Sequence, residues 1–322
     1  MIPLQTPLPR RDALKSLLAA GLTGTFPEIP VPLPKPPAKP FAVHIFSKTL
    51  HFLSPDELAT VAAETGFDGV DLTVRPAGHV EPGRVREDLP KAVAAMQKAG
   101  LGPPMMTTAI ASADEEATRA ILETAKKLSI THYRMGWLTY PPKQTIPETL
   151  AQYKTQLTAL ARLNAENQVV GTYQNHAGAN LGSPVWDLAQ LLQQINSPWL
   201  GSQYDIRHAV VEGGGSWPLG LQLIQPHIRV LAIKDVIWKV VNGRWRPVSV
   251  PLGQGMVDFP AYFAALKKYG VQAPISLHLE YPLGGAEEGK RQITVPRETV
   301  YAAMRTDLQT LKKMMREAGL AV

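Results

Sequence analysis

The 322-residue chain contains no cysteine, which excludes disulfides, thiolate catalysis and cysteine-ligated zinc. After its first 40 residues it also lacks any apolar run near the ~20 residues that a membrane span needs. Basic residues outnumber acidic ones, 33 to 27, but they are scattered, and no basic stripe predicts nucleic-acid binding. What is present, 45% hydrophobic and 19% charged residues, is typical of a globular protein with a large core.

The N-terminus has a different composition from the rest of the chain. Arg10 and Arg11 precede a short, weakly apolar run, and residues 1–26 resemble a twin-arginine export signal. The alternative is a short amphipathic helix with two surface arginines. Residues 27–40 are rich in proline and predict a stiff, extended linker without a core. We therefore expect a bacterial protein that is exported to the periplasm, and the missing cysteine rules out a lipoprotein anchor.

From residue 41 to residue 322, short strand-like runs alternate with longer helix-like ones. The strand candidates are FAVHIFSK, GVDLTV, PMMTTAI, HYRMGW, VVGTYQ, LGSQYD, VLAIKD and ISLHLE. Eight strands, each followed by a helix, predict an α/β fold, a single-domain (β/α)8 TIM barrel. An open doubly wound sheet is the rival, but no glycine-rich phosphate loop opens the first helix. Asn242-Gly243 predicts a hairpin after the seventh strand, which is either a lid or a surface cover.

Polar side chains gather where the predicted strands end. In such barrels the carboxyl ends of the strands hold the active site, and burying so many polar groups without partners would be costly. We therefore predict a solvated pocket that binds a small-molecule sugar or glycoside, with Trp238 of the hairpin placed to stack on a sugar ring. The candidate substrate-binding residues are His44, Arg75, Arg134, His176, Asp235, Trp238 and His278.

Six segments resemble, in order and spacing, the sugar phosphate isomerase/epimerase family with the xylose isomerase-like barrel. They are GFDGVDLTV, YQNHAG, YDIRHA, AIKD, PLGQGMVDFPAYFAAL and SLHLEY, and the resemblance runs from Phe41 to the C-terminus. It implies that the chain moves a proton beside a sugar carbonyl through an enediolate, and that barrels of this kind associate into homo-oligomers. A lyase or hydratase acting on a keto-glycoside, and a non-catalytic sugar-binding barrel, are the alternatives. A nuclease of the related abasic-site type would need more than the eight histidines present.

The resemblance also implies one divalent ion, Mn, Mg or Zn, held by glutamate, aspartate, histidine and a second glutamate. Asp205 and Glu280 match two of these ligands, but Gln174 replaces the first glutamate and Ala232 replaces the histidine. Two alternatives stay open. Either Gln174, Asp205 and Glu280 hold the metal weakly, or the metal is gone and Lys234 supplies the positive charge.

The resemblance assigns the catalytic roles as well. His208, three residues after Asp205, matches the histidine that contacts substrate, and Lys234 matches the lysine after the seventh strand. In the metal-free alternative Glu280 or a histidine is the base. The expected catalytic residues are therefore Glu280, Lys234 and His208.

Overall fold

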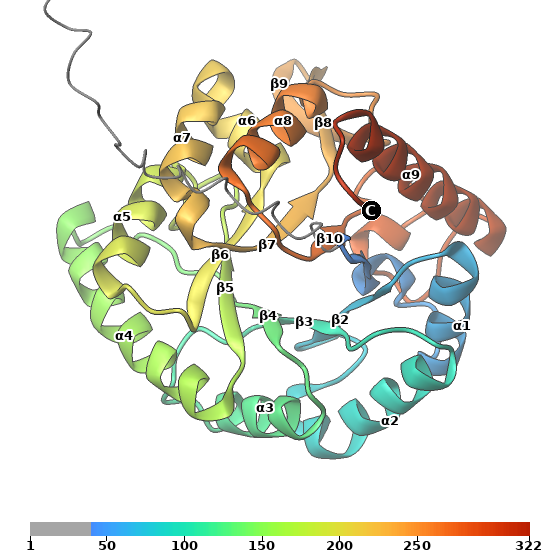
Figure 1. Cartoon of the computed structure of the whole chain (residues 1–322), viewed down its shortest axis with the longest axis horizontal. Coiled ribbons are helices and arrows are strands. Elements are labelled where there is room, and N and C mark those ends of the chain that lie inside the picture. The colour runs from blue at the N-terminus through green and yellow to red at the C-terminus, as the bar shows by residue number, and fades with distance from the viewer. Residues whose placement is uncertain (1–39) are drawn as a thin grey trace, which may run out of the picture. The chain divides into compact units, whose positions relative to one another are not determined.

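Eight parallel strands close into a barrel, as predicted (Figure 1). The computed structural model describes residues 40–322, so the predicted signal, and the linker except Pro40, lie outside the described residues. Around the barrel the strands follow the order β1-β10-β7-β6-β5-β4-β3-β2. Their bounds are β1 Val43–Phe46, β2 Gly69–Val74, β3 Met105–Thr108, β4 His132–Arg134, β5 Val170–Gln174, β6 Leu200–Asp205, β7 Ile228–Ile233 and β10 Ile275–Leu277.

Helices cover the outside of the barrel. They are α1 Pro55–Thr65, α2 Val85–Lys98, α3 Glu116–Lys127, α4 Ile146–Asn167, α5 Val185–Ile195, α6 Ile206–Gly213, α7 Trp217–Ile224, α8 Phe259–Tyr269 and α9 Arg297–Glu317. Helix α1 has well-defined ends, because Ser54 and Glu57 form a reciprocal capping box at its start and Gly66 ends it with φ 95°. Among residues 40–322 no helix combines the length and the apolarity needed to cross a bilayer.

Helix α2 begins earlier than the sequence suggested. Proline at position 90 indicated a helix start there, because proline is favoured in the first turn. The helix instead starts at Val85, directly after a 3-10 turn at Pro82–Arg84, and Pro90 lies inside it. Burial of Val85 and Leu89 against the barrel offsets the backbone hydrogen bond that Pro90 cannot donate.

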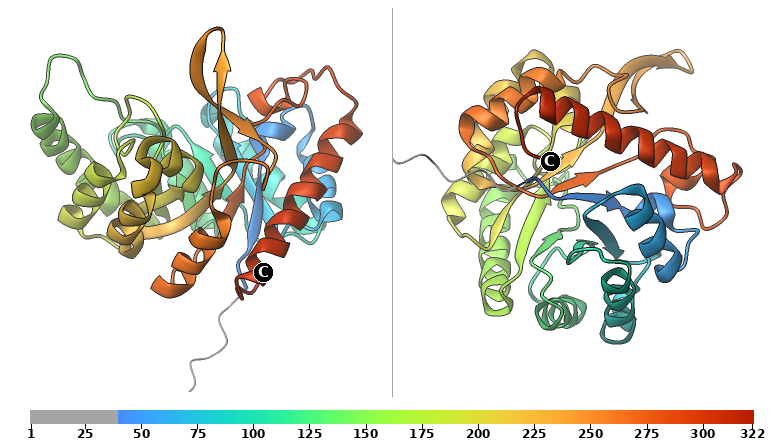
Figure 2. Two further views of the ribbon diagram at one scale, coloured as in Figure 1. Left: turned by 90° about the horizontal axis from the view of Figure 1, so that it is seen from above. Right: turned by 45° about the vertical axis from the view of Figure 1, so that its right-hand side comes forward.

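A two-stranded antiparallel hairpin leaves the barrel directly after β7. Its strands are β8 Asp235–Val241 and β9 Arg244–Val250, and Asn242 and Gly243 have φ of 51° and 72°. Positive φ at both turn residues is the type I′ geometry that the sequence predicted. The hairpin projects from the barrel (Figure 2, left), and the Trp245 side chain at its tip is 67% exposed.

Candidate functional site

A cavity of about 190 Å³ opens at the carboxyl ends of the strands. Most of the residues that line it come from the ends of β1, β2, β4, β5 and β7, and from the segment after β10. Four of them are cations and one is a carboxylate, so this is a polar pocket with a positive excess. The lining residues are Phe46, Lys48, Arg75, Arg134, Trp137, Gln174, His176, Lys234 and Glu280.

The Lys234 ammonium lies between two carboxylates. Its Nζ is 2.8 Å from Oε2 of Glu280 and 3.2 Å from Oδ2 of Asp205, and both Lys234 and Asp205 are almost completely buried. Lys48 Nζ contacts the other oxygen of Glu280 at 3.0 Å. Burial alone would raise the pKa of Glu280, but the ammonium groups of Lys234 and Lys48 outweigh it and hold that pKa well below its usual range. Glu280 is therefore an anion at neutral pH.

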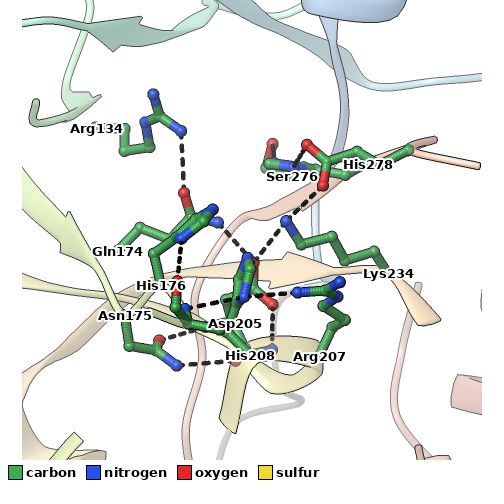
Figure 3. A network of polar contacts seen from close by, with 12 residues as sticks. Arg134, Gln174, Asn175, His176, Asp205, Arg207, His208, Lys234, Ser276 and His278 are labelled. Carbon is green, nitrogen blue, oxygen red and sulfur yellow. Dashed lines mark hydrogen bonds and ion pairs between the residues drawn. The ribbon is translucent and has the colours of Figure 1, made fainter. Parts of the chain in front are cut away.

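The Gln174 side chain has a fixed orientation (Figure 3). Its amide Nε2 donates to Oδ2 of Asp205 at 2.6 Å, and its Oε1 accepts from Arg134 at 3.0 Å. The neighbouring Asn175 joins β5 to β6 through two hydrogen bonds with the Asp205 backbone, at 2.8 and 3.0 Å. The three residues of the Gln-Asn-His sequence thus have different roles. Gln174 binds the Asp205 carboxylate, Asn175 holds the ends of β5 and β6 together, and His176 lines the cavity.

Hydrogen bonds define the protonation of two neighbouring histidines. His176 Nδ1 lies 2.9 Å from the Ala177 carbonyl, so Nδ1 carries the proton and Nε2 keeps its lone pair. His208 lies behind it, with ring centroids 4.0 Å apart, and its Nδ1 accepts from the Ala177 amide at 3.1 Å. Burial, then Lys234, lowers the pKa of both rings, so both are neutral.

A hydrogen-bonded chain runs behind Glu280. Thr107 and Ser276 donate to the two oxygens of Asp71 at 2.9 and 2.6 Å, and His278 Nε2 lies 3.0 Å from the Ser276 hydroxyl. Because Ser276 uses its proton on Asp71, it must accept from His278, which leaves His278 Nδ1 without a proton. That nitrogen is buried and lies 3.7 Å from Oε1 of Glu280.

The residues present do not fit a divalent ion at the position that the family resemblance implies. All four oxygens of Asp205 and Glu280 already face donors, namely Lys48, Lys234, the Gln174 amide and the His208 backbone N–H. An ammonium fills the space between the carboxylates and would repel a cation. Ala232 is fully buried, in register with Asp205, and its methyl group offers no ligand. Among residues 40–322 no three His, Asp or Glu side chains converge as a metal site.

Four of the candidate substrate-binding residues lie away from the cavity lining. His44 packs over Gly69, where a Cβ would lie only 2.5 Å from the ring, and Trp238 is half-exposed on the hairpin. His278 is buried behind Glu280 and stacks on Phe46 at 4.3 Å. The Asp235 carboxylate binds the loop after the hairpin. It accepts backbone N–H groups of four residues, Val236, Gly253, Gly255 and Val257, at 2.8–3.3 Å.

That loop explains the glycines of the Gly-Gln-Gly motif. Gly253 has φ 82°, and a Cβ at Gly255 would lie 2.1 Å from the Asp235 carboxylate. The motif therefore closes the loop around Asp235 in this chain.

Three lining residues were absent from the sequence-based site. Phe46 and Lys48 lie at and just after the end of β1, and Trp137 follows β4. Lys48 was visible as a polar residue at a strand end, and its role depends on its contact with Glu280. Phe46 had no polar signal, yet its ring lies within 6 Å of three cations, those of Lys48, Arg75 and Arg134.

Comparisons with known proteins agree with this architecture. A family model described as a xylose isomerase-like TIM barrel matches residues 59–294. A sequence comparison with curated proteins finds no match. Among solved structures, a D-allulose 3-epimerase from Methylomonas sp. is 16% identical, with a TM-score of 0.62 over 86% of this chain and 99% of that one.

Two further solved structures share the fold at similar distance. A 3-keto-D-glucoside 4-epimerase from E. coli is 14% identical, with a TM-score of 0.62 over 85% of this chain and 99% of that one. A probable 3-DHS dehydratase from Bacillus anthracis is 14% identical, with a TM-score of 0.61 over 84% and 98%. Identities this low establish the shared barrel and leave the reaction to the site itself.

Proposed function

The chain belongs to the xylose isomerase-like TIM barrel family, and we propose on that basis that it isomerises or epimerises a sugar or keto-sugar. In this proposal Glu280 removes a proton beside the carbonyl, and Lys234 stabilises the enediolate that results. The observation that carries it is the Lys234 ammonium, which lies within 3.2 Å of both Asp205 and Glu280 where a bridging cation is needed.

Substrate binding would activate the base. Glu280 is a weak base in the free site because two ammonium groups hold its pKa well below its usual range, against the opposing effect of burial. A carbonyl oxygen that accepts a hydrogen bond from Lys234 competes with Glu280 for that donor. The basicity of Glu280 then rises when the oxyanion partner is in place, which couples proton removal to charge stabilisation.

His176 supplies the second acid–base group that epimerisation or isomerisation requires. Its Nε2 has a lone pair and no protein partner, and the ring lines the cavity from the end of β5. Two strands, β6 and β7, separate β5 from β10, so His176 and Glu280 approach the ligand from different sides. After Glu280 removes a proton, His176 can deliver one from the other side only after its Nε2 has taken a proton from solvent, and this delivery inverts the carbon centre.

Elimination is the second candidate reaction. The same enolate loses a β-hydroxyl or a glycosidic oxygen if His176, once protonated, donates to the leaving group. Glu280 and His176 thus serve a lyase or hydratase acting on a keto-glycoside as well as an epimerase, and product analysis distinguishes the two.

Proton exchange tests the proposal. Wild-type protein and Glu280→Gln are incubated in D₂O with free and 3-keto sugars, and deuterium in the recovered sugar is measured by mass spectrometry. We expect incorporation with the wild type, and a decrease of at least about 100-fold in Glu280→Gln. Sugar binding by both proteins, without exchange or product in either, would instead identify a binding protein.

We also propose that the protein acts outside the cytoplasm, on the basis of the paired Arg10 and Arg11 and the proline-rich stretch that follows. Export would favour an unphosphorylated substrate, since phosphorylated sugars are largely cytoplasmic metabolites.

A further inference from the structure

Two arginines in the cavity have no anionic partner. Arg75 and Arg134 both line it, and neither forms an ion pair with any described residue between 40 and 322. The other two cations, Lys48 and Lys234, are balanced by Glu280 and Asp205. The positive excess of the pocket therefore belongs to the two guanidinium groups.

Asp71 forms no ion pair with either of them. Asp71 attracts both guanidinium groups electrostatically, but each of its oxygens already accepts a hydroxyl hydrogen bond, from Thr107 and Ser276. Arg134 is only 6% exposed, and its Nε is buried without a hydrogen-bond partner. Burial, followed by repulsion from Arg75, lowers the pKa of Arg134 to about 10, so it remains charged at neutral pH.

Aromatic contacts hold these guanidinium groups at the cavity wall. Both Cζ atoms lie 5.9 Å from the centre of the Phe46 ring, and Arg134 also lies 4.7 Å from the Trp137 ring. Within the described part of the chain, the Gln174 amide oxygen is the acceptor for the Arg134 guanidinium group. A pair of positioned guanidinium groups without a carboxylate matches the fork geometry by which arginine binds an anion.

Arg134 is the arginine that lies far from the reacting groups. It ends β4, which lies opposite β10 in the closed strand order, whereas Arg75 follows β2, and β1 alone separates β2 from β10. We propose that the substrate is an acidic sugar, a uronate, whose carboxylate binds between Arg75 and Arg134 while its carbonyl end faces Lys234 and Glu280. This inference deepens the proposed function and rests on it for the reacting end. The cavity of about 190 Å³ is of the size of a single sugar ring.

Equilibrium binding tests the inference without requiring turnover. Calorimetric titrations compare glucuronate, galacturonate and mannuronate with glucose, galactose, mannose and glucose 6-phosphate. We expect at least one uronate to bind about 30-fold more tightly than its parent hexose, the effect of charge-assisted hydrogen bonds. Arg75→Gln should reduce that preference to less than about threefold, while Arg316→Gln, an equal charge change on exposed α9, should leave it unchanged.

Arg134→Lys is the second variant, because it keeps a cation near Gln174 but loses the fork, and the preference should again decrease. If no uronate binds more tightly than its hexose, or if Arg75→Gln keeps the preference, the acidic-sugar inference is overturned. Tighter binding of glucose 6-phosphate than of any uronate would overturn the carboxylate assignment. Uronate preference without deuterium exchange would refute the proposed reaction alone, and exchange on neutral sugars without the preference would refute this inference alone.

Discussion

Replacing Lys234 by methionine should convert this site from a metal-free arrangement into one that binds a divalent ion. The substitution removes the ammonium from its position 2.8 Å from Glu280 and 3.2 Å from Asp205, and it retains an apolar chain of similar length. Two carboxylates are then left facing each other without the cation between them.

The size of the effect follows from those distances. The two carboxylate oxygens that share Lys234 are no more than about 6 Å apart, where they repel by roughly 3 kcal/mol at an effective dielectric constant of about 20. We therefore expect Lys234→Met to lower the free energy of unfolding at pH 7 by ~3 kcal/mol, at the lower end of the range for broken buried pairs.

The pH dependence should differ between the two proteins. In the wild type the pKa of Glu280 is held below its unfolded value, so its contribution to stability is present above about pH 4.3 and is lost as the pH falls further. In Lys234→Met the two carboxylates repel each other, so the native state gains by binding a proton between them. The difference in free energy of unfolding between wild type and variant should therefore decrease as the pH falls from 7 toward about 4.3.

Urea unfolding across this pH range, and thermal unfolding with and without 1 mM Mn²⁺, test the prediction. Mn²⁺ should raise the midpoint temperature of Lys234→Met by several degrees and leave the wild type unchanged. Lys48→Met is the matched control, because it removes a cation from Glu280 and leaves Lys234 between the carboxylates. An equal Mn²⁺ response in wild type and Lys234→Met, or a variant as stable as the wild type at pH 7, would refute the reasoning.

Three further outcomes are expected. Burial lowers the pKa of His51 to about 4 and that of His79 to about 3. These two histidines should therefore lower the free energy of unfolding by roughly 2 kcal/mol as the pH falls from 6.5 to 5, after a discount for solvent screening. In urea titrations, His79→Gln should reduce this pH dependence. Asp235→Ala should lower the free energy of unfolding by at least ~3 kcal/mol, since four backbone N–H groups lose their acceptor, and unchanged urea stability would contradict that role. Lysine at both Arg10 and Arg11 should block export, and cell fractionation showing undiminished periplasmic protein would contradict the signal.

The barrel was predictable because its signals are local. Each strand is a short apolar run with its own boundaries, and the turn at Asn242-Gly243 depends on two adjacent residues with positive φ. The start of α2 was wrong for the same reason. The local rule that proline favours the first helical turn placed the start at Pro90. The helix begins earlier because Val85 and Leu89 are buried against the barrel, a tertiary effect that a short stretch of sequence does not show.

The sequence predicted which strand ends form the site, but it predicted few of the contacts that their side chains make. Sequence position brought Gln174, Asp205, Lys234 and Glu280 together correctly. It did not show that Asp235, the neighbour of Lys234, faces away and binds a loop, because alternation along a strand end assigns a face only if the strand continues. The aromatic residues that line the cavity are apolar, so a search for polar residues at strand ends did not find them.

The altered ligand positions form one consistent arrangement of charge. A glutamate at position 174 would place a third carboxylate against Asp205 Oδ2, where an N–H···O bond of 2.6 Å now lies, and pairing of that glutamate with Arg134 would leave the repulsion at Asp205 Oδ2 in place. With glutamine at position 174, the side chain donates a hydrogen bond to Asp205 instead of repelling it. The negative charges of Asp205 and Glu280 are then balanced by the positive charges of Lys234 and Lys48. Gln174 and Lys234 therefore depend on each other, so Gln174→Glu alone or Lys234→Met alone should destabilise the site.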